Sequence, residues 1–300
     1  MEFIMIVLPA FLIFLIGYIG QKTIGFNIKS ISTAALYLMY PFLSFRTFYT
    51  NSMTIEYIYI FIFCILLCAT MTGVVLITSK IRKSPRSITA AFILSGVFMN
   101  AGNYGTPIIL FAFGGAGFDY AIIMMIVQSL LMNTIGLYIA AMGGSEKSSM
   151  KESLMKVAKM PMIHGAIIGA FFHAASITVP ESVMGAIDLV ADATIPTIMI
   201  VLGMQLAAFN KQRVKLSDVS LIVMIKMFLS PLAAYIIITL MPIEGLLAGI
   251  LIILSAMPSA ANTAMVSLQF NTEPDLVSFT TLVTTIISIV TIPLLLMWVM

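Results

Sequence analysis

Two polar stretches interrupt long apolar runs of this chain, and no other feature limits its possible folds as strongly. The first covers residues 100–107, with the sequence NAGNYGTP, and the second covers residues 257–263, with the sequence MPSAANT. Because hydrocarbon offers backbone groups no water to bond, irregular backbone at membrane depth is tolerated only where it is buried in protein or lines a wet cavity. Two interrupted spans at matching positions in the halves of a chain are typical of the substrate site of a secondary transporter.

The composition indicates a membrane protein. The chain is 61% hydrophobic and only 9% charged, whereas a soluble domain carries roughly 25% charged residues. At about 20 residues per crossing, we predict an all-α polytopic membrane protein with ten transmembrane helices. The predicted spans are 3–21, 29–49, 56–79, 87–113, 119–141, 159–177, 182–208, 214–240, 245–270 and 275–299.

The basic residues predict the orientation in the membrane. Of the 15 Lys and Arg residues, all but Arg46 and Lys226 lie in or beside the connections after spans one, three, five and seven. The positive-inside rule makes these connections cytoplasmic, so both termini are expected on the outer side of the cell (inner) membrane. The N-terminal stretch lacks the features of a signal peptide and is expected to be an uncleaved first span. The dispersed basic residues give no reason to expect a nucleic-acid partner.

Prolines recur across the two halves of the chain and suggest an internal duplication. Pro9 and Pro161 are 152 residues apart, Pro41 and Pro196 are 155 apart, and the two polar breaks are offset by about the same length. We therefore predict a first five-helix repeat over 1–141, a cytoplasmic linker over 142–158 and a second repeat over 159–300. An odd number of spans inverts the second copy, so broken helices four and nine would cross at the membrane centre. The alternative is a chance coincidence of prolines.

The residues of the crossing favour an anionic ligand. Thr106 followed by Pro107 predicts a helix start, and Asn262 could cap the second half-helix. Each restart would direct backbone N–H groups and the positive end of a helix dipole toward the midplane. The alternative is that these residues only satisfy their own broken backbone. The predicted substrate site is Asn100, Asn103, Tyr104, Gly105, Thr106, Pro107, Pro258, Ser259, Asn262 and Thr263.

Ionisable residues within the spans supply candidates for ion coupling or charge balance, since each costs a few kcal/mol unless it is paired or hydrated. Lys226 is the strongest candidate, with a fixed structural pair as its alternative. Asp192, one turn from Asp188, could carry a proton or line a vestibule, and Arg46 could simply snorkel to the interface. Gln128 is the third candidate, although polar strips such as the one that it forms with Asn133 and Thr134 are more often interhelical contacts than ion ligands.

No enzyme chemistry, metal site or cofactor is predicted. The chain has no His-Glu-x-x-His zinc pair and no aspartyl-protease or Asp-rich lipid-synthase motif. Cys64 and Cys68 lie one helical turn apart in an apolar span, without a nearby His or Asp, and are expected to be small core residues.

Four short motifs together resemble the auxin efflux carrier family. They are Asn100-x4-Gly105-x-Pro107, Pro196-x6-Gly203-x-Gln205-Leu206, Lys226-x4-Pro231 and Met257-Pro258. The family includes plant auxin exporters and bacterial carriers associated with malate and malonate, and the resemblance covers essentially the whole chain. This chain departs from the plant exporters at Met99, where they have proline, and in its short cytoplasmic loop. A bacterial organic-anion carrier is therefore the nearer interpretation.

The resemblance also implies a fold and a mechanism. The fold would be that of the bile-acid:sodium symporters, with scaffold helices one, two, six and seven and a mobile core of helices three to five and eight to ten. Transport would be an elevator motion, with a homodimer formed through the scaffold. The resemblance further implies that Asn100 contacts the substrate carboxylate and that Pro258 shapes the second half of the crossing.

These observations predict a proton-linked or uniport secondary transporter for a small mono- or dicarboxylate. A sodium-coupled symporter of the bile-acid type and a membrane sensor without transport are the alternatives. A cation/proton antiporter is disfavoured because the crossing lacks paired acidic residues. The expected partners are the carboxylate, a proton or sodium ion, the lipid bilayer and a second copy of the chain.

Overall fold

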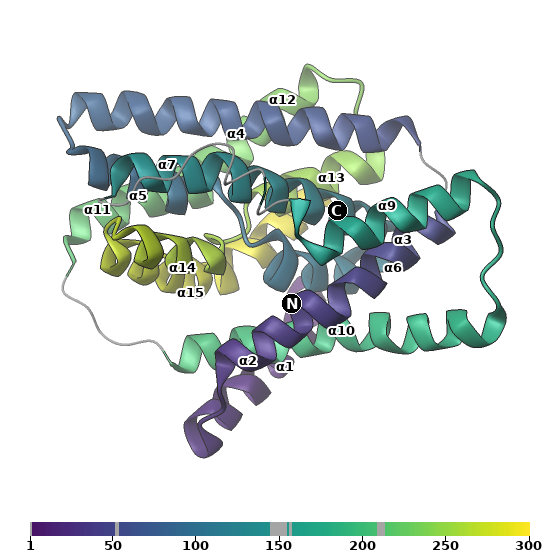
Figure 1. Ribbon diagram of the computed structural model, residues 1–300. Helices are drawn as coiled ribbons and strands as arrows, with labels where there is room; N and C mark the ends of the chain where they lie inside the picture. The colour runs from purple at the N-terminus through teal and green to yellow at the C-terminus, as the bar shows by residue number, and fades with distance from the viewer. Residues whose placement is uncertain (1, 52–53, 145–154, 156–157, 209–213) are drawn as a thin grey trace.

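The computed structural model describes the chain except residues 1, 52–53, 145–154, 156–157 and 209–213. Over this part the protein is helical, and its only extended pairing is one isolated antiparallel bridge between Met99 and Ser259 (Figure 1). Most of the predicted linker at 142–158, including Lys147, Lys151 and Lys156, lies outside the described residues.

Helices occupy each of the predicted spans. In the first half they are α1 (Glu2–Ile24), α2 (Ile28–Ala34), η1 (Ala35–Met39), α3 (Tyr40–Thr50), α4 (Ile55–Ile81), α5 (Arg86–Val97), η2 (Ala101–Gly105), α6 (Thr106–Leu131), η3 (Met132–Gly136) and α7 (Leu137–Gly143). In the second half they are α9 (Pro161–Ala174), α10 (Glu181–Ala207), α11 (Leu216–Met224), η4 (Ile225–Leu229), α12 (Ser230–Thr239), α13 (Gly245–Ser255), α14 (Ala261–Phe270) and α15 (Pro274–Val299).

Five helical stretches are long and apolar enough to cross a membrane: Ile55–Ile81, Ala101–Gly143, Glu181–Ala207, Leu216–Thr239 and Pro274–Val299. Shorter apolar helices accompany them, and large side chains such as Leu189 and Leu268 are exposed on the surface. The chain is thus a multi-pass membrane protein, while ten crossings and the inverted repeat stay predictions. The longest stretch is broken at Gly114, which has φ +67°, between predicted spans four and five.

The η segments are single π-helical turns, and three of these four turns end two residues before a proline. The prolines are Pro41 after η1, Pro107 after η2 and Pro231 after η4. A proline lacks the N–H that an α-helix needs, and its ring clashes with the carbonyl four residues earlier. A wider turn directly before the proline relieves this conflict, and such turns occur frequently at functional sites.

Two helix pairs from opposite halves of the chain pack with their backbones almost touching. Helix α1 packs along α10, and α3 packs along α9. A Cβ added to Gly203 of α10 would lie 1.9 Å from the Phe14 carbonyl oxygen, and one added to Gly165 of α9 would lie 2.1 Å from that of Pro41. Small residues at such contacts allow the close packing that holds helices together in lipid, where burial of apolar surface gives little driving force.

The remaining helices pack around α4, α5 and α15. Helix α4 contacts α5, α6 and α12, and α5 contacts α11 and α14. Helix α15 contacts α5, α11, α13 and α14. In Figure 1 the long helices α4 and α10 lie along opposite sides of the molecule. The helices α1, α3, α9 and α10, together with α2 and η1, thus form one packing group, and the remaining helices form a second. The two groups contact each other through α1, which touches α6 and α15, and through α10, which touches η2. The broken segments of the chain therefore lie where the two groups meet.

Replacing Gly203 with Ala should destabilise the protein, because the added methyl group has no space beside the Phe14 carbonyl. We expect a loss of about 1–3 kcal/mol, measured as a lower thermal unfolding temperature in detergent. Gly185, on the same helix, has open space around its Cα. Gly185→Ala is thus the matched control and should keep or slightly raise the unfolding temperature. Equal effects of the two substitutions would contradict the close helix contact.

Candidate binding site at the crossing of two broken helices

The two polar breaks lie against each other and satisfy part of each other's backbone. Helix α5 ends at Val97 and α13 ends at Ser255. Between these ends and the starts of η2 and α14, the two segments of the chain run antiparallel to each other. The Asn100 N–H donates to the Pro258 carbonyl at 2.8 Å, and the Ala260 N–H donates to the Phe98 carbonyl at 3.0 Å. The predicted crossing of the two interrupted spans is therefore present, and protein atoms replace water as the partners of these backbone groups.

Side chains behind the crossing hold it in place. Ser259 donates its hydroxyl to the Ser95 carbonyl at 2.6 Å, and its N–H bonds the Thr284 hydroxyl at 3.2 Å. The Tyr104 hydroxyl accepts a hydrogen bond from Ser288 at 2.7 Å, and its ring stacks on that of Phe14. These groups are buried and serve the packing of the crossing.

The helices restart earlier than the sequence indicated. The helical path resumes at Ala101 as the π-turn η2, so Asn100 takes the cap position that was expected for Thr106. The Thr106 hydroxyl instead donates to the Ala101 carbonyl at 2.8 Å. In the second break the cap position belongs to Ala260, and Asn262 lies in the first turn of α14. The predicted capping roles of Thr106 and Asn262 are therefore wrong, because helical geometry begins before either residue.

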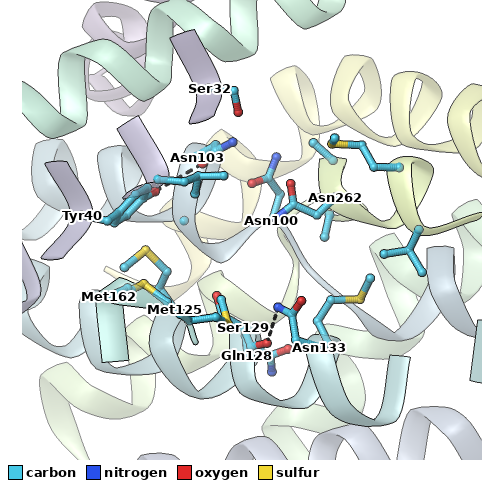
Figure 2. Close-up of a pocket in the computed structure, with 18 of the residues that line it drawn as sticks. Ser32, Tyr40, Asn100, Asn103, Met125, Gln128, Ser129, Asn133, Met162 and Asn262 are labelled. Carbon is cyan, nitrogen blue, oxygen red and sulfur yellow. Dashed lines mark hydrogen bonds between the residues drawn. The ribbon is translucent and has the colours of Figure 1, made fainter. Parts of the chain in front are cut away.

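A cavity of about 960 Å³ lies on one side of the crossing. Asn100 and Asn262 project side by side into it from the two breaks, and Gln128, Ser129 and Asn133 face them from the helix across the cavity (Figure 2). Lys29 and Lys159 also line this cavity and are exposed, so they lie where it meets solvent. Apart from these two lysines, the polar side chains of its lining are amides and hydroxyl groups, with no carboxylate among the lining residues.

Asn100 is the most informative residue of the cavity wall. The residue is 6% exposed, and its amide nitrogen is buried without a hydrogen-bond partner. The neighbouring Asn103 differs, because its amide oxygen accepts a hydrogen bond from the Tyr40 hydroxyl at 3.2 Å. A buried donor without a partner costs about 1–3 kcal/mol. An acceptor atom of a ligand in the cavity would remove that cost.

The structure divides the ten predicted substrate residues into two sets. Asn100, Asn103 and Asn262 line the cavity. The others belong to the backbone or buried packing of the crossing and are outside the cavity wall: Tyr104, Gly105, Thr106, Pro107, Pro258, Ser259 and Thr263.

Sequence reasoning missed a second wall of the cavity, which comes from other helices. Ser32, Tyr37 and Tyr40 belong to α2, η1 and α3, and Gln205 belongs to α10. Only Gln205 carried a signal, as part of a family motif. Thioether side chains are also prominent in the wall: Met99, Met125, Met132, Met160, Met162 and Met265.

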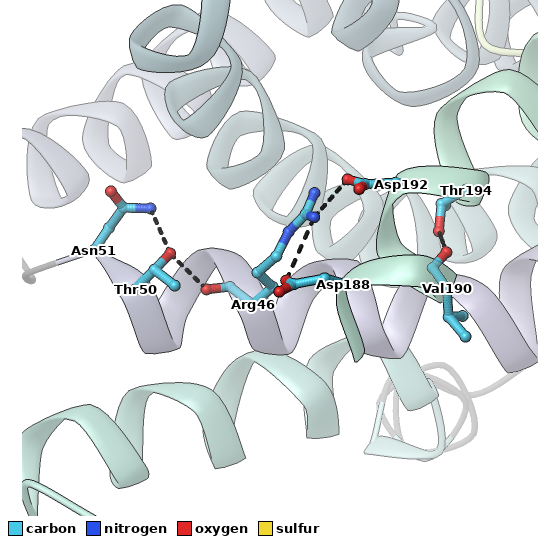
Figure 3. A network of polar contacts seen from close by, with 7 residues as sticks. All are labelled: Arg46, Thr50, Asn51, Asp188, Val190, Asp192 and Thr194. Atoms are coloured by element: carbon cyan, nitrogen blue, oxygen red, sulfur yellow. Dashed lines mark hydrogen bonds and ion pairs between the residues drawn. The ribbon is translucent and has the colours of Figure 1, made fainter. Parts of the chain in front are cut away.

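Of the three candidates for ion coupling, only Gln128 lines the cavity. Asp192 accepts a hydrogen bond from Arg46 at 2.6 Å, and Asp188 lies 3.6 Å from the same guanidinium nitrogen. Figure 3 shows Arg46 between the two carboxylates, so α3 and α10 are joined by an ion pair. Lys226 is fully buried, and its ammonium donates to the Ser255 carbonyl at 3.4 Å. Among the described residues, no group of three or more His, Cys, Asp or Glu side chains could hold a metal ion.

Comparison with known proteins places these observations in a family. Residues 2–296 match the family described as membrane transport proteins. An uncharacterized transporter of Methanothermobacter thermautotrophicus is 24% identical over 97% of this chain and 94% of its own. One of Methanocaldococcus jannaschii is 27% identical over 96% of each chain. A Rhizobium meliloti protein provisionally named a malonate transporter is 25% identical over 66% of this chain and 63% of its own. The family and these relatives are transporters, not enzymes.

Replacing Asp192 with Asn should change stability slightly and leave any transport unaltered. Asp192 is largely exposed and pairs with Arg46. In the variant, the Arg46 guanidinium still has the Asp188 carboxylate as a neighbour. Because exposed ion pairs contribute about 0–1 kcal/mol, we expect a small decrease in unfolding temperature, with Asp188→Asn as the matched control. A changed dependence of transport on pH or sodium in the Asp192 variant alone would restore its predicted coupling role.

Proposed function

Because this chain belongs to the membrane transport protein family, which includes the auxin efflux carriers, we propose that it is a secondary active carrier of a small organic anion. The carboxylate of this anion would bind at the crossing. The observation that carries the proposal is that Asn100 lines the cavity while its buried amide nitrogen has no hydrogen-bond partner. The name of the Rhizobium relative agrees with a carboxylate substrate.

The helix ends at the crossing support a negatively charged ligand. The first turns of η2 and α14 border the cavity through Ala101 and Ala261. Each helix N-terminus presents N–H groups without intrahelical partners and a partial charge of roughly +0.5. Two converging ends together approximate one positive charge. They could balance one carboxylate without any cationic side chain in the depth of the cavity.

The two walls of the cavity support an elevator mechanism. One wall comes from helices of the predicted scaffold, through Tyr40, Met162 and Gln205, and the other comes from the predicted core, through Asn100 and Gln128. A substrate bound between these bodies would move with the core when it slides along the scaffold. The close packing of α1 with α10 and of α3 with α9 suits a scaffold that keeps its shape. The same proposal includes a homodimer formed through this scaffold. It also includes a location in the cell membrane, with both termini outside.

The mouth of the cavity supports an inward-facing state. Lys29 and Lys159 lie at this mouth and belong to the connections that the positive-inside rule places in the cytoplasm. Under that orientation the crossing is open to the cytoplasm, so the carboxylate would enter or leave on this side. We propose that transport is coupled to protons or is not coupled to any ion.

Uptake of labelled mono- and dicarboxylates into proteoliposomes, with and without pH and sodium gradients, tests the function. Asn100→Ala removes the donor that we assign to the carboxylate. The expected loss is about 1–3 kcal/mol of binding, which corresponds to roughly 5- to 150-fold in affinity.

Tyr104→Phe is the matched control for this test. It removes the hydrogen bond to Ser288 behind the crossing and should cost about 1 kcal/mol of stability with little change in substrate affinity. If wild-type protein transports no carboxylate under any gradient, the proposed substrate class is wrong. If the Asn100 variant transports like wild type, Asn100 is not the anchor.

Reversing the charges at the mouth should slow entry of an anion from that side. In the double variant Lys29→Glu, Lys159→Glu, we expect initial uptake from the cavity side to decrease roughly tenfold at low ionic strength. The difference should shrink at high salt, because salt screens exposed charges beyond about 10 Å. Lys80→Glu, Lys83→Glu is the control, since these exposed lysines do not line the cavity. An equal effect of both double variants would indicate general surface charge instead of a mouth.

A further inference from the structure

Lys226 is a fully buried ammonium group that has no place in the anion site. It lies in the π-turn η4, does not line the cavity, and donates to the Ser255 carbonyl at 3.4 Å. Ser230, four residues later, donates its hydroxyl to the same oxygen at 2.8 Å. Two donors on one face of this segment therefore converge on a single carbonyl.

That carbonyl is the C-terminal end of a broken helix. Ser255 is the last residue of α13, directly before the crossing, and the last carbonyls of a helix lack intrahelical partners. They carry the negative end of the helix dipole, roughly −0.5 of an elementary charge. The equivalent end in the other half, α5, is treated differently, because its Ser95 carbonyl accepts from the neutral hydroxyl of Ser259 at 2.6 Å. Of the two negative ends at the crossing, one receives a neutral donor and the other receives a cation.

No carboxylate neutralises Lys226 within the described part of the chain. The ion pairs found there involve only Arg46 and Arg82. Helices α5, α11, α12 and α15 pack against η4. Of their charged residues, Asp218 is paired with Arg82 at 2.7 Å, while Arg86 and Asp275 lie in the first turns of α5 and α15. The carbonyl end of α13 is therefore the group that faces the ammonium.

The charges at the crossing then form two complementary sets. The two helix N-termini total roughly +1 and face the cavity, where they would balance an anion. The two C-terminal ends total roughly −1, and the ammonium of Lys226, bonded to the α13 end, carries a charge of equal magnitude and opposite sign. In transporters with broken helices, unwound carbonyls and half-helix C-termini coordinate the coupling sodium ion.

We propose that the ammonium of Lys226 is a built-in cation that takes the place of a dissolved coupling cation at the C-terminal ends of the broken helices. This inference rests on the proposed function. It makes the carrier independent of sodium. Removing the amine should create a site that a small monovalent cation can fill.

Lys226→Ser tests this directly, because it removes the charge and leaves a hydroxyl and a space beside the Ser255 carbonyl. The first measurement is the thermal unfolding temperature of the purified full chain in sodium chloride and in choline chloride of equal ionic strength. Wild-type protein should show no difference, whereas the serine variant should be about 2–4 °C more stable in sodium. Ser230→Ala is the matched control. It removes the neutral donor to the same oxygen and should gain no sodium dependence.

The second measurement is carboxylate uptake by the same proteins in proteoliposomes. The serine variant should transport about tenfold more slowly than wild type in choline and should recover in part with sodium. Lys226→Met keeps the volume of the side chain but leaves no cation site, so it should be slow in both salts. If the serine variant cannot be purified, Lys226→Thr, which also leaves a hydroxyl and a space beside the Ser255 carbonyl, replaces it in both assays, with the same expectations.

The outcomes separate this inference from the proposed function. If wild-type protein requires sodium, or if the serine variant shows neither sodium-dependent stability nor a loss of uptake, Lys226 is not a built-in cation, whatever the substrate. If wild-type protein transports no carboxylate, the proposed function fails, while the unfolding temperatures still report whether removing the amine creates a cation site.

Discussion

The structure depends on how two lengths of broken backbone are satisfied inside a protein that lies in a membrane. Hydrocarbon supplies no hydrogen-bond partner, so an interrupted helix must find one within the chain. Here each break supplies partners to the other, through the bonds from Asn100 to Pro258 and from Ala260 to Phe98. This pairing fixes where α5 and α13 end, brings four helix ends together, and creates the polar region in which both a carboxylate and an ammonium can be placed.

Much of this arrangement could be predicted from the sequence. The hydrophobic runs indicate a polytopic membrane protein, and the two polar stretches correctly locate the breaks. The family resemblance is confirmed by the match over residues 2–296. These features were accessible because they depend on local composition and on short spacings. The expectation that Cys64 and Cys68 are core residues also agrees with the structure, in which both thiols are buried and free of disulfides.

The direction of individual side chains could not be predicted. A regular helix assigns side chains to faces by its period, but a break followed by a π-turn removes that rule. Tyr104 therefore points into the protein toward Ser288, while Asn103, one residue earlier, points into the cavity. The second wall was missed for another reason. Tyr40 and Gln205 reach the cavity only because distant segments of the chain pack together, and spacing within one sequence does not show such contacts.

The hydrogen bond from Tyr40 to Asn103 joins a helix of one packing group to the break in the other. At 3.2 Å this bond is already long for a hydroxyl donor, so a small displacement is enough to break it. Any sliding of one group past the other must therefore break this bond. A ligand that engages the Asn103 amide would compete with Tyr40 for the same oxygen or leave it in place, depending on which end of the amide it uses. Substrates with similar affinity could thus differ in turnover, because only some of them would loosen the contact that resists movement.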